Sequence, residues 1–201
     1  AANAFEGVIE FKVIDGKNDP VFYECSIKGS QTRMEAKHLD KQNTSVITDL
    51  DRKKIIFLMH DDTRFMEMSY ADKKSKEPKD NEIFQFKKTG KKEKILGTLC
   101  EEWISTKKDE TAEIWATKAL SGFSGFGSKK KSDVFVQNQL QKEGLFPMKM
   151  ILKNEKGKDI SSWAVTNIEK KKINPGVYRP PKDYIKVDAP QKGSLKNFVL
   201  I

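Results

Sequence analysis

The chain has 201 residues, 37% of them hydrophobic and 33% charged, and a formal net charge of +9. This composition is typical of one soluble globular domain that buries a substantial core. It excludes a membrane-spanning helix, because no run approaches the roughly 20 consecutive apolar residues that such a helix needs.

The first third of the chain alternates between apolar and polar residues, as half-buried strands do. Strands are predicted at 5–14, 21–28, 32–38 and 45–50, and the turns between them are rich in Gly, Asp and Asn. Short connections of this kind favour an antiparallel sheet over parallel crossovers.

Residues 54–70 form the most apolar stretch, a predicted hairpin around the turn at 61–63. Its first arm is apolar on both faces, as a strand covered on both sides must be. The apolar residues of the two arms are Ile55, Ile56, Phe57, Leu58, Met59, Phe65, Met66 and Met68. We expect this hairpin to form the floor of an apolar core or cavity.

The middle of the chain begins with a charged segment, 71–81, which we predict to be an exposed loop. Further strands are predicted at 83–88, 94–97, 99–106 and 113–117. One helical turn at 118–123 and a helix at 133–143 follow; the helix is capped by Ser132 and ends at Gly144. We expect the apolar side of this helix to cover the sheet.

The last part of the chain is predicted to close with a hairpin, 146–153 and 162–169. The tail from Pro175 to Pro190 should lie extended along the surface, because its proline-rich parts cannot continue a strand ladder.

The positive charge is carried almost entirely by dispersed lysines, whereas arginine is scarce. Arginine is the residue that favours phosphates and guanine edges, so we interpret the lysines as solvating the surface and predict no nucleic-acid partner. Residues 1–4 lack the basic and apolar regions of a signal peptide, which indicates either a cytosolic protein or an exported one already processed.

The segment 122–129 lies between a strand and a helix, where a phosphate-binding loop would be found. In such a loop a lysine follows the last glycine directly, whereas here Ser128 intervenes. Phe123 and Phe126 also occupy positions that should present backbone amides. We therefore interpret the segment as a hinge or lid whose phenylalanines dock onto apolar surface.

No catalytic residue, metal site or cofactor is predicted. His60 precedes the Asp61-Asp62 turn and His38 ends a strand, and neither lies near a nucleophile motif, so we interpret both as surface residues. We interpret Asp49 and Asp51, and likewise Asp61 and Asp62, as turn-forming residues in preference to metal ligands or acid–base groups. The two cysteines, Cys25 and Cys100, are expected to be buried free thiols without metal-binding spacing.

The remaining signal is the number of methionine and aromatic side chains. Plain core is the default interpretation. The more specific alternative is an adaptable cavity for lipid or acyl chains, because methionine surfaces repack around varied ligands. The candidate lining residues are Phe57, Met59, Met66, Met68, Trp103, Trp115, Phe123, Phe126, Met148 and Met150.

Several short stretches resemble a known family: 5–7, 47–54 with 57–59, 95–103, 113–117, 145–148 and 180–184. The resemblance is to exported bacterial proteins that contain a domain of unknown function, similar in organisation to the periplasmic lipoprotein carriers of the LolA/LolB-like superfamily. It implies an exported protein, periplasmic or outer-membrane-associated, with a mainly β (α+β) fold. The expected architecture is a curved antiparallel sheet or half-barrel with one or two helices on its concave face.

In the carriers, the covered space holds the acyl chains of lipoproteins. The present sequence starts directly with a predicted strand instead of their N-terminal helix, so we expect one wall of that cavity to be missing. We expect a single carrier-like domain at 1–188, a tail at 189–201 and no enzymatic activity. The ligand would be a lipid, acyl chain or lipoprotein between the sheet and residues 118–143, and peripheral association with a membrane is compatible with this. The alternative is a structural or sensory protein-interaction module with a filled core.

Overall fold

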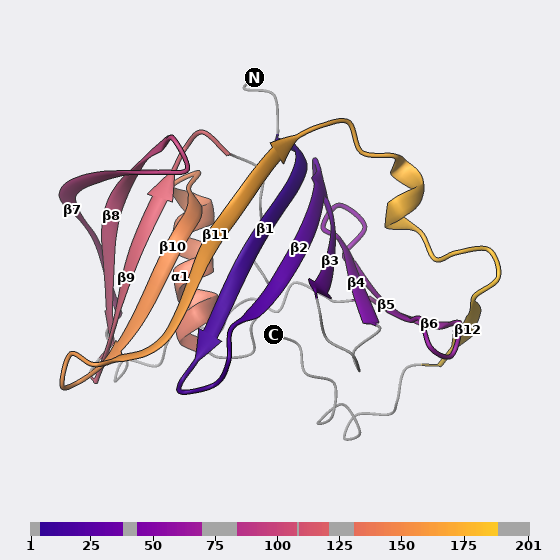
Figure 1. Ribbon diagram of the computed structural model, residues 1–201, viewed down its shortest axis with the longest axis horizontal. Coiled ribbons are helices and arrows are strands. Elements are labelled where there is room, and N and C mark those ends of the chain that lie inside the picture. Colours follow the sequence, from indigo (N-terminus) through magenta and orange to yellow (C-terminus); the bar gives the residue numbers. More distant parts are fainter. Residues whose placement is uncertain (1–4, 38–43, 70–83, 108, 121–130, 189–201) are drawn as a thin grey trace.

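A computed structural model describes residues 5–37, 44–69, 84–107, 109–120 and 131–188 (Figure 1). In this part of the chain twelve strands form one open sheet in the order β12-β6-β5-β4-β3-β2-β1-β11-β10-β9-β8-β7. Every neighbouring pair is antiparallel except β12 with β6, which is parallel. The predicted fold class, a mainly β protein built on an antiparallel sheet, is confirmed.

The strands are β1 (Glu6–Asp15), β2 (Val21–Lys28), β3 (Gln31–Lys37), β4 (Thr44–Asp49), β5 (Lys54–Met59), β6 (Arg64–Ser69), β7 (Phe84–Ile95), β8 (Thr98–Lys107), β9 (Glu110–Thr117), β10 (Phe146–Asn154), β11 (Asp159–Lys170) and β12 (Ile185–Val187). The helices are α1 (Lys131–Lys142) and the short 3₁₀-helix η1 (Pro175–Tyr178). Neither is long and apolar enough to cross a membrane.

Two sequence predictions need correction. The strands expected at 83–88 and 94–97 are the two halves of β7, which is bent by an irregularity between Lys88 and Lys92. Thr89 and Gly90 form a bulge within one strand and do not separate two strands, because β8 continues to pair with β7 on both sides of the bend.

The tail was expected to lie extended along the surface, yet Pro175–Tyr178 form the 3₁₀-helix η1, with Tyr178 buried. Its residues 185–187 form β12 beside β6. This three-residue stretch contains no proline, so it keeps the backbone donors that pairing needs. Four further predictions lie outside the described residues: the loop at 71–81, the helical turn beyond residue 120, the segment 122–129 and the tail from 189. His38 does so as well.

Glycine is required in the interior of β1 for a steric reason. Gly7 has a φ of 158°, and a Cβ atom at this position would lie 2.2 Å from the backbone oxygen of Glu169 in β11. The close approach of β11 to β1 therefore depends on the missing side chain.

The sheet is covered in two places, on opposite faces. Helix α1 lies behind β9–β11 in Figure 1, and its Val136 and Leu140 pack with Ala112, Ile114 and Ala116 of β9. The expectation that the helix covers the sheet is confirmed.

At the other end of the sheet the segment 171–187, called the strap below, runs past β3 to β6 and contains η1 and β12 (Figure 1). Its Ile173 and Tyr178 pack with Val8, Ile47 and Leu58. Leu58 is fully buried, as the two-sided apolar pattern of the hairpin predicted.

Candidate functional site

The face of the sheet against which α1 packs, called the helix face below, is apolar across nearly all of its width. Directly paired residues on neighbouring strands share a face. One such row crosses β8, β9, β10, β11, β1 and β2 and consists of Trp103, Ile114, Met150, Trp163, Val13 and Val21. A second row, from β11 to β12, consists of Ile168, Ile9, Cys25, Met34, Val46, Phe57, Met66 and Val187.

Aromatic rings lie between these two rows. Phe11 stacks on Tyr23 with ring centroids 5.2 Å apart, and the ring of Trp163 lies 5.6 Å from that of Phe11. Because Phe11 occupies the position between Ile9 and Val13 on β1, these rings join the rows into one continuous apolar surface.

This surface is much wider than the helix that packs on it. Strands lie about 4.8 Å apart, so the apolar face from β8 to β12 extends roughly 50 Å along the sheet. A helix is only about 10 Å wide with its side chains. Helix α1 therefore packs on only a small part of the face. The rest is not open to solvent: no residue of the two rows is exposed, and Ile9, Cys25 and Met66 are at most 2% exposed.

The structure distributes the predicted lining residues between two regions. Phe57, Met59, Met66 and Met68 lie on the helix face of β5 and β6, while Trp103 and Met150 lie near α1. Six strand spacings separate β5 from β10, about 29 Å along the sheet. These two groups therefore do not form one compact lining.

The other predicted residues lie elsewhere. Trp115 alternates with Ile114 along β9, so its side chain leaves the opposite side of the strand, where Lys149 Nζ is 5.8 Å from the ring centroid. Met148 is fully buried in the largest core cluster. Phe123 and Phe126 lie outside the described residues.

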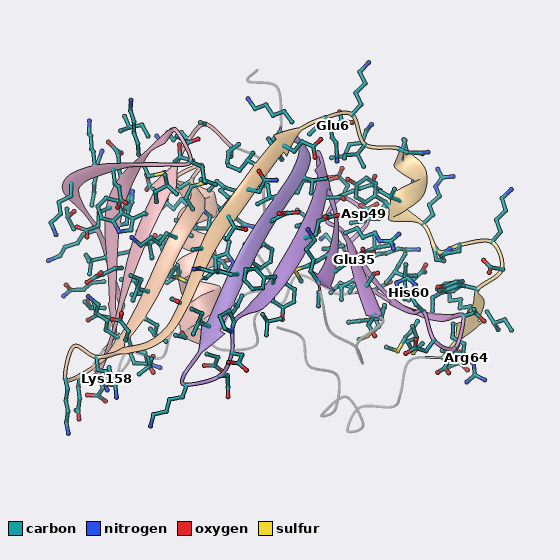
Figure 2. All side chains as sticks on the ribbon, in the orientation of Figure 1. Glu6, Glu35, Asp49, His60, Arg64 and Lys158 are labelled. Atoms are coloured by element: carbon teal, nitrogen blue, oxygen red, sulfur yellow. The ribbon has the colours of Figure 1, made fainter. Side chains whose placement is uncertain are left out.

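The opposite face carries a chain of polar contacts that the sequence did not predict. His60 Nδ1 lies 2.6 Å from the hydroxyl of Tyr184, and His60 Nε2 lies 2.5 Å from Ser45 Oγ. Ser45 Oγ in turn lies 2.8 Å from Glu35 Oε1, to which Arg33 Nε donates at 2.7 Å. Figure 2 labels Glu35 and His60 in this region, on the side of η1 and β12.

One arrangement of protons satisfies every member of this chain. Tyr184 donates to His60 Nδ1, the protonated Nε2 donates to Ser45, and Ser45 donates to Glu35. His60 is then neutral and Glu35 ionised, so Arg33 has an anionic partner.

The electrostatics agree with this assignment. Burial lowers the pKa of His60, and the positive charge of Arg33 lowers it further, against the opposing charges of Glu35 and Asp61. Burial by itself would raise the pKa of Glu35, but the hydrogen bond from Ser45 and the charge of Arg33 together hold it below its usual value.

A serine hydroxyl beside an imidazole is also the arrangement of a catalytic serine nucleophile and its histidine base. Here Ser45 is only 1% exposed and its proton is directed to Glu35, so the hydroxyl is not presented to a substrate. Within the described ranges, no group of three His, Cys, Asp or Glu side chains is placed to hold a metal ion.

The polar chain instead ties the strap to the sheet. Arg33 also donates to the backbone oxygen of Val177 at 3.2 Å, and Glu6 accepts from the backbone N–H of Ile173 at 2.8 Å. The interpretation of His60 as an ordinary surface histidine was wrong, because both of its ring nitrogens lie within hydrogen-bonding distance of a partner. One of these partners, Tyr184, is 124 positions away in the sequence. No local pattern could have indicated that contact.

Comparison with known proteins places the chain in a family. Residues 5–184 match DUF4412, a domain of unknown function. The chain belongs to the DUF4412 family. The predicted resemblance to a domain-of-unknown-function family is thereby confirmed. No curated protein matches the sequence.

Solved structures share the fold of this DUF4412 chain at low sequence identity. An uncharacterized conserved protein from Thermus thermophilus has a TM-score of 0.55 and 10% identity, with 92% of this chain and 91% of that protein covered. PNGF-II has a TM-score of 0.54 and 16% identity, with 92% and 32% covered. MucB, in the Pseudomonas aeruginosa MucA/MucB complex, has a TM-score of 0.54 and 11% identity, with 92% and 59% covered.

The DUF4412 chain thus spans less than two thirds of PNGF-II and of MucB. A putative outer membrane lipoprotein-sorting protein domain from Vibrio parahaemolyticus also matches, with 9% identity and 86% and 87% of the two chains covered. Its TM-score of 0.35 is too low to establish a common fold.

Proposed function

We propose that this DUF4412 protein is a non-enzymatic module of the cell envelope, periplasmic or outer-membrane-associated, that binds a hydrophobic ligand on its helix face. The ligand class is a lipid or the acyl chain of a lipoprotein. The observation that carries the proposal is the pair of apolar rows, which run across eleven strands, far beyond the few on which α1 packs. Because the residues of these rows are buried or half-buried, a ligand would enter by replacing their present cover.

Burial of methylene groups would supply the affinity. Ten methylenes removed from water contribute roughly 8 kcal/mol. A micromolar Kd is therefore the tightest binding that ten methylenes allow, before the ordering costs of association are subtracted. Flexible side chains such as Met34, Met66 and Met150 on the helix face allow chains of different length and saturation to be accommodated.

A titration with a fluorescent fatty acid tests the proposal. Val21 and Phe22 are neighbours on β2 but face opposite sides: Val21 ends the first apolar row, whereas Phe22 is 41% exposed on the other face. We expect Val21→Glu to weaken binding by tenfold or more, because a carboxylate would then meet the acyl chain, and Phe22→Glu to leave it unchanged.

Thermal unfolding of both variants controls for loss of fold. Wild-type protein that binds no fatty acid, or a folded Val21→Glu variant that binds as tightly as wild type, would contradict the proposal.

A second candidate is a protein-interaction module, favoured by the fold that this chain shares with MucB of the MucA/MucB complex. Native mass spectrometry of the protein purified gently from its own envelope discriminates between the two. A lipid mass on the folded chain supports the first candidate, and a stoichiometric polypeptide without lipid supports the second.

A further inference from the structure

The turn between β7 and β8 holds a residue type that its backbone conformation disfavours. Leu96 has a φ of 49° and Gly97 a φ of 77°, so both central residues of this two-residue turn have positive φ. Such turns favour Asn, Asp or Gly at the first position, because a side chain without local hydrogen bonding is disfavoured there. Leu96 gains no packing in return, since it is 52% exposed.

A second leucine stands beside it. Leu99 is also 52% exposed, and the two belong to the four large hydrophobic residues exposed in the described part of the chain. Their hairpin projects from the sheet: pairing of β8 with β9 begins at Glu101 and Ala116, and β9 ends one residue later. Residues 98 and 99 therefore extend about 7 Å beyond β9.

Lysines surround the projecting leucines. Lys94 pairs directly with Leu99, and Lys91 and Lys92 follow along β7 with side chains 71% and 56% exposed. Their partners Glu102 and Glu101 are only 5% and 27% exposed, so the acidic groups lie inward and the amines outward. Glu93 lies between Lys92 and Lys94 and is 44% exposed. Residues 87–102 hold five lysines against three glutamates, so the hairpin carries a small net positive charge.

The same end of the sheet carries further lysines. β9 and β11 are both antiparallel to β10, so they end on the same side as the β7–β8 turn. Lys118 follows the end of β9, and Lys170, Lys171 and Lys172 stand at and after the end of β11. This end of the sheet therefore carries more lysines than the hairpin alone supplies.

We propose that the β7–β8 hairpin, with Leu96 and Leu99 at its tip, is a docking site for an anionic lipid bilayer. Exposed apolar side chains enter the boundary between headgroups and acyl chains, and the surrounding amines meet the phosphates. A small, convex, charged tip fits this partner better than it fits a protein, whose binding would require a broader complementary surface. The proposal does not depend on a ligand at the helix face.

Co-sedimentation of the full chain with phosphatidylglycerol-containing vesicles is the test. We expect binding that falls between 50 and 500 mM salt and that is much weaker on phosphatidylcholine vesicles. Leu96→Asn and Leu99→Asn should each weaken binding by roughly fivefold to tenfold, because each removes one apolar anchor. Ile185→Asn, at a 65% exposed position in β12, is the matched control and should bind as wild type.

Leu96→Asn separates a docking role from a structural one. Because Asn is preferred at this turn position, the variant should unfold at a higher denaturant concentration than wild type while it binds vesicles less well. Equal binding of the two leucine variants and wild type, equal binding to both lipids, or destabilisation by Leu96→Asn would each overturn the proposal. The fatty-acid titration at the helix face should be unaffected by Leu96→Asn, so the two proposals can fail separately.

Discussion

His60 follows β5 and precedes two aspartates, and its neighbours along the chain would raise rather than lower its pKa. In the folded protein, burial and Arg33 lower the pKa below the ordinary value of 6.5. The unfolded chain therefore takes up the proton more readily than the folded chain does. The contribution of neutral His60 to stability is complete above about pH 6.5 and is lost as the pH falls through the folded pKa.

We therefore expect the free energy of unfolding to fall between pH 7.5 and 5, and a His60→Asn variant to show a shallower slope over this range. Urea denaturation at several pH values measures it. The carboxylates with lowered pKa, including Glu35 and Glu67, lose their contribution only at more acidic pH, below about 4.5, so they do not mask the effect. Parallel pH profiles for wild type and variant would contradict the assignment of a neutral His60.

Among the described side chains of helix α1, Val136 and Leu140 are the buried apolar ones that pack on the sheet. Leu140 is 5% exposed and packs in the cluster with Ile114 and Ala116 of β9, whereas Asn138 on the same helix is exposed. The helix therefore depends on the apolar contacts of one side, as is general for short helices in water.

Leu140→Ala is expected to lower the free energy of unfolding by about 2–5 kcal/mol, because it leaves a cavity between helix and sheet. Asn138→Ala, the control on the exposed side, should change it by no more than about 0.5 kcal/mol. Chemical denaturation with a two-state fit compares the two. Similar values for both variants would show that α1 does not pack stably on β9.

At the scale of the whole molecule, the sheet protects both thiols. Cys25 is 2% exposed in the second apolar row and Cys100 is fully buried. Burial raises the pKa of Cys25 to about 12 and also raises that of Cys100, so at neutral pH both are protonated and inaccessible.

Both thiols should therefore react with an aromatic disulfide reagent at pH 8 only as fast as the protein opens. We expect labelling over minutes to hours in buffer and complete labelling within seconds in 6 M guanidinium, followed by absorbance. Rapid labelling of one thiol in buffer would show that the apolar face around it opens locally.

Much of this architecture was predictable from local sequence. The alternating patterns located β1, β2, β10 and β11 to within a few residues, and Gly144 correctly marked the end of α1. The two-sided apolar pattern of β5 correctly predicted that Leu58 and Phe57 would be buried on opposite faces. Each of these properties depends on residues within one strand or one helical turn, so a short stretch of sequence is enough to predict it.

Only the tertiary structure decided which elements meet. The pairing of β12 with β6, the separation of the hairpin residues from α1 and the contact of His60 with Tyr184 all join segments far apart in sequence. The pairing order of twelve strands depends on which apolar faces can be buried together, and many orders are compatible with the same local patterns. The sequence by itself thus predicts the apolar character of each strand. The continuous apolar face forms only when the strands pair in the order that the tertiary structure gives.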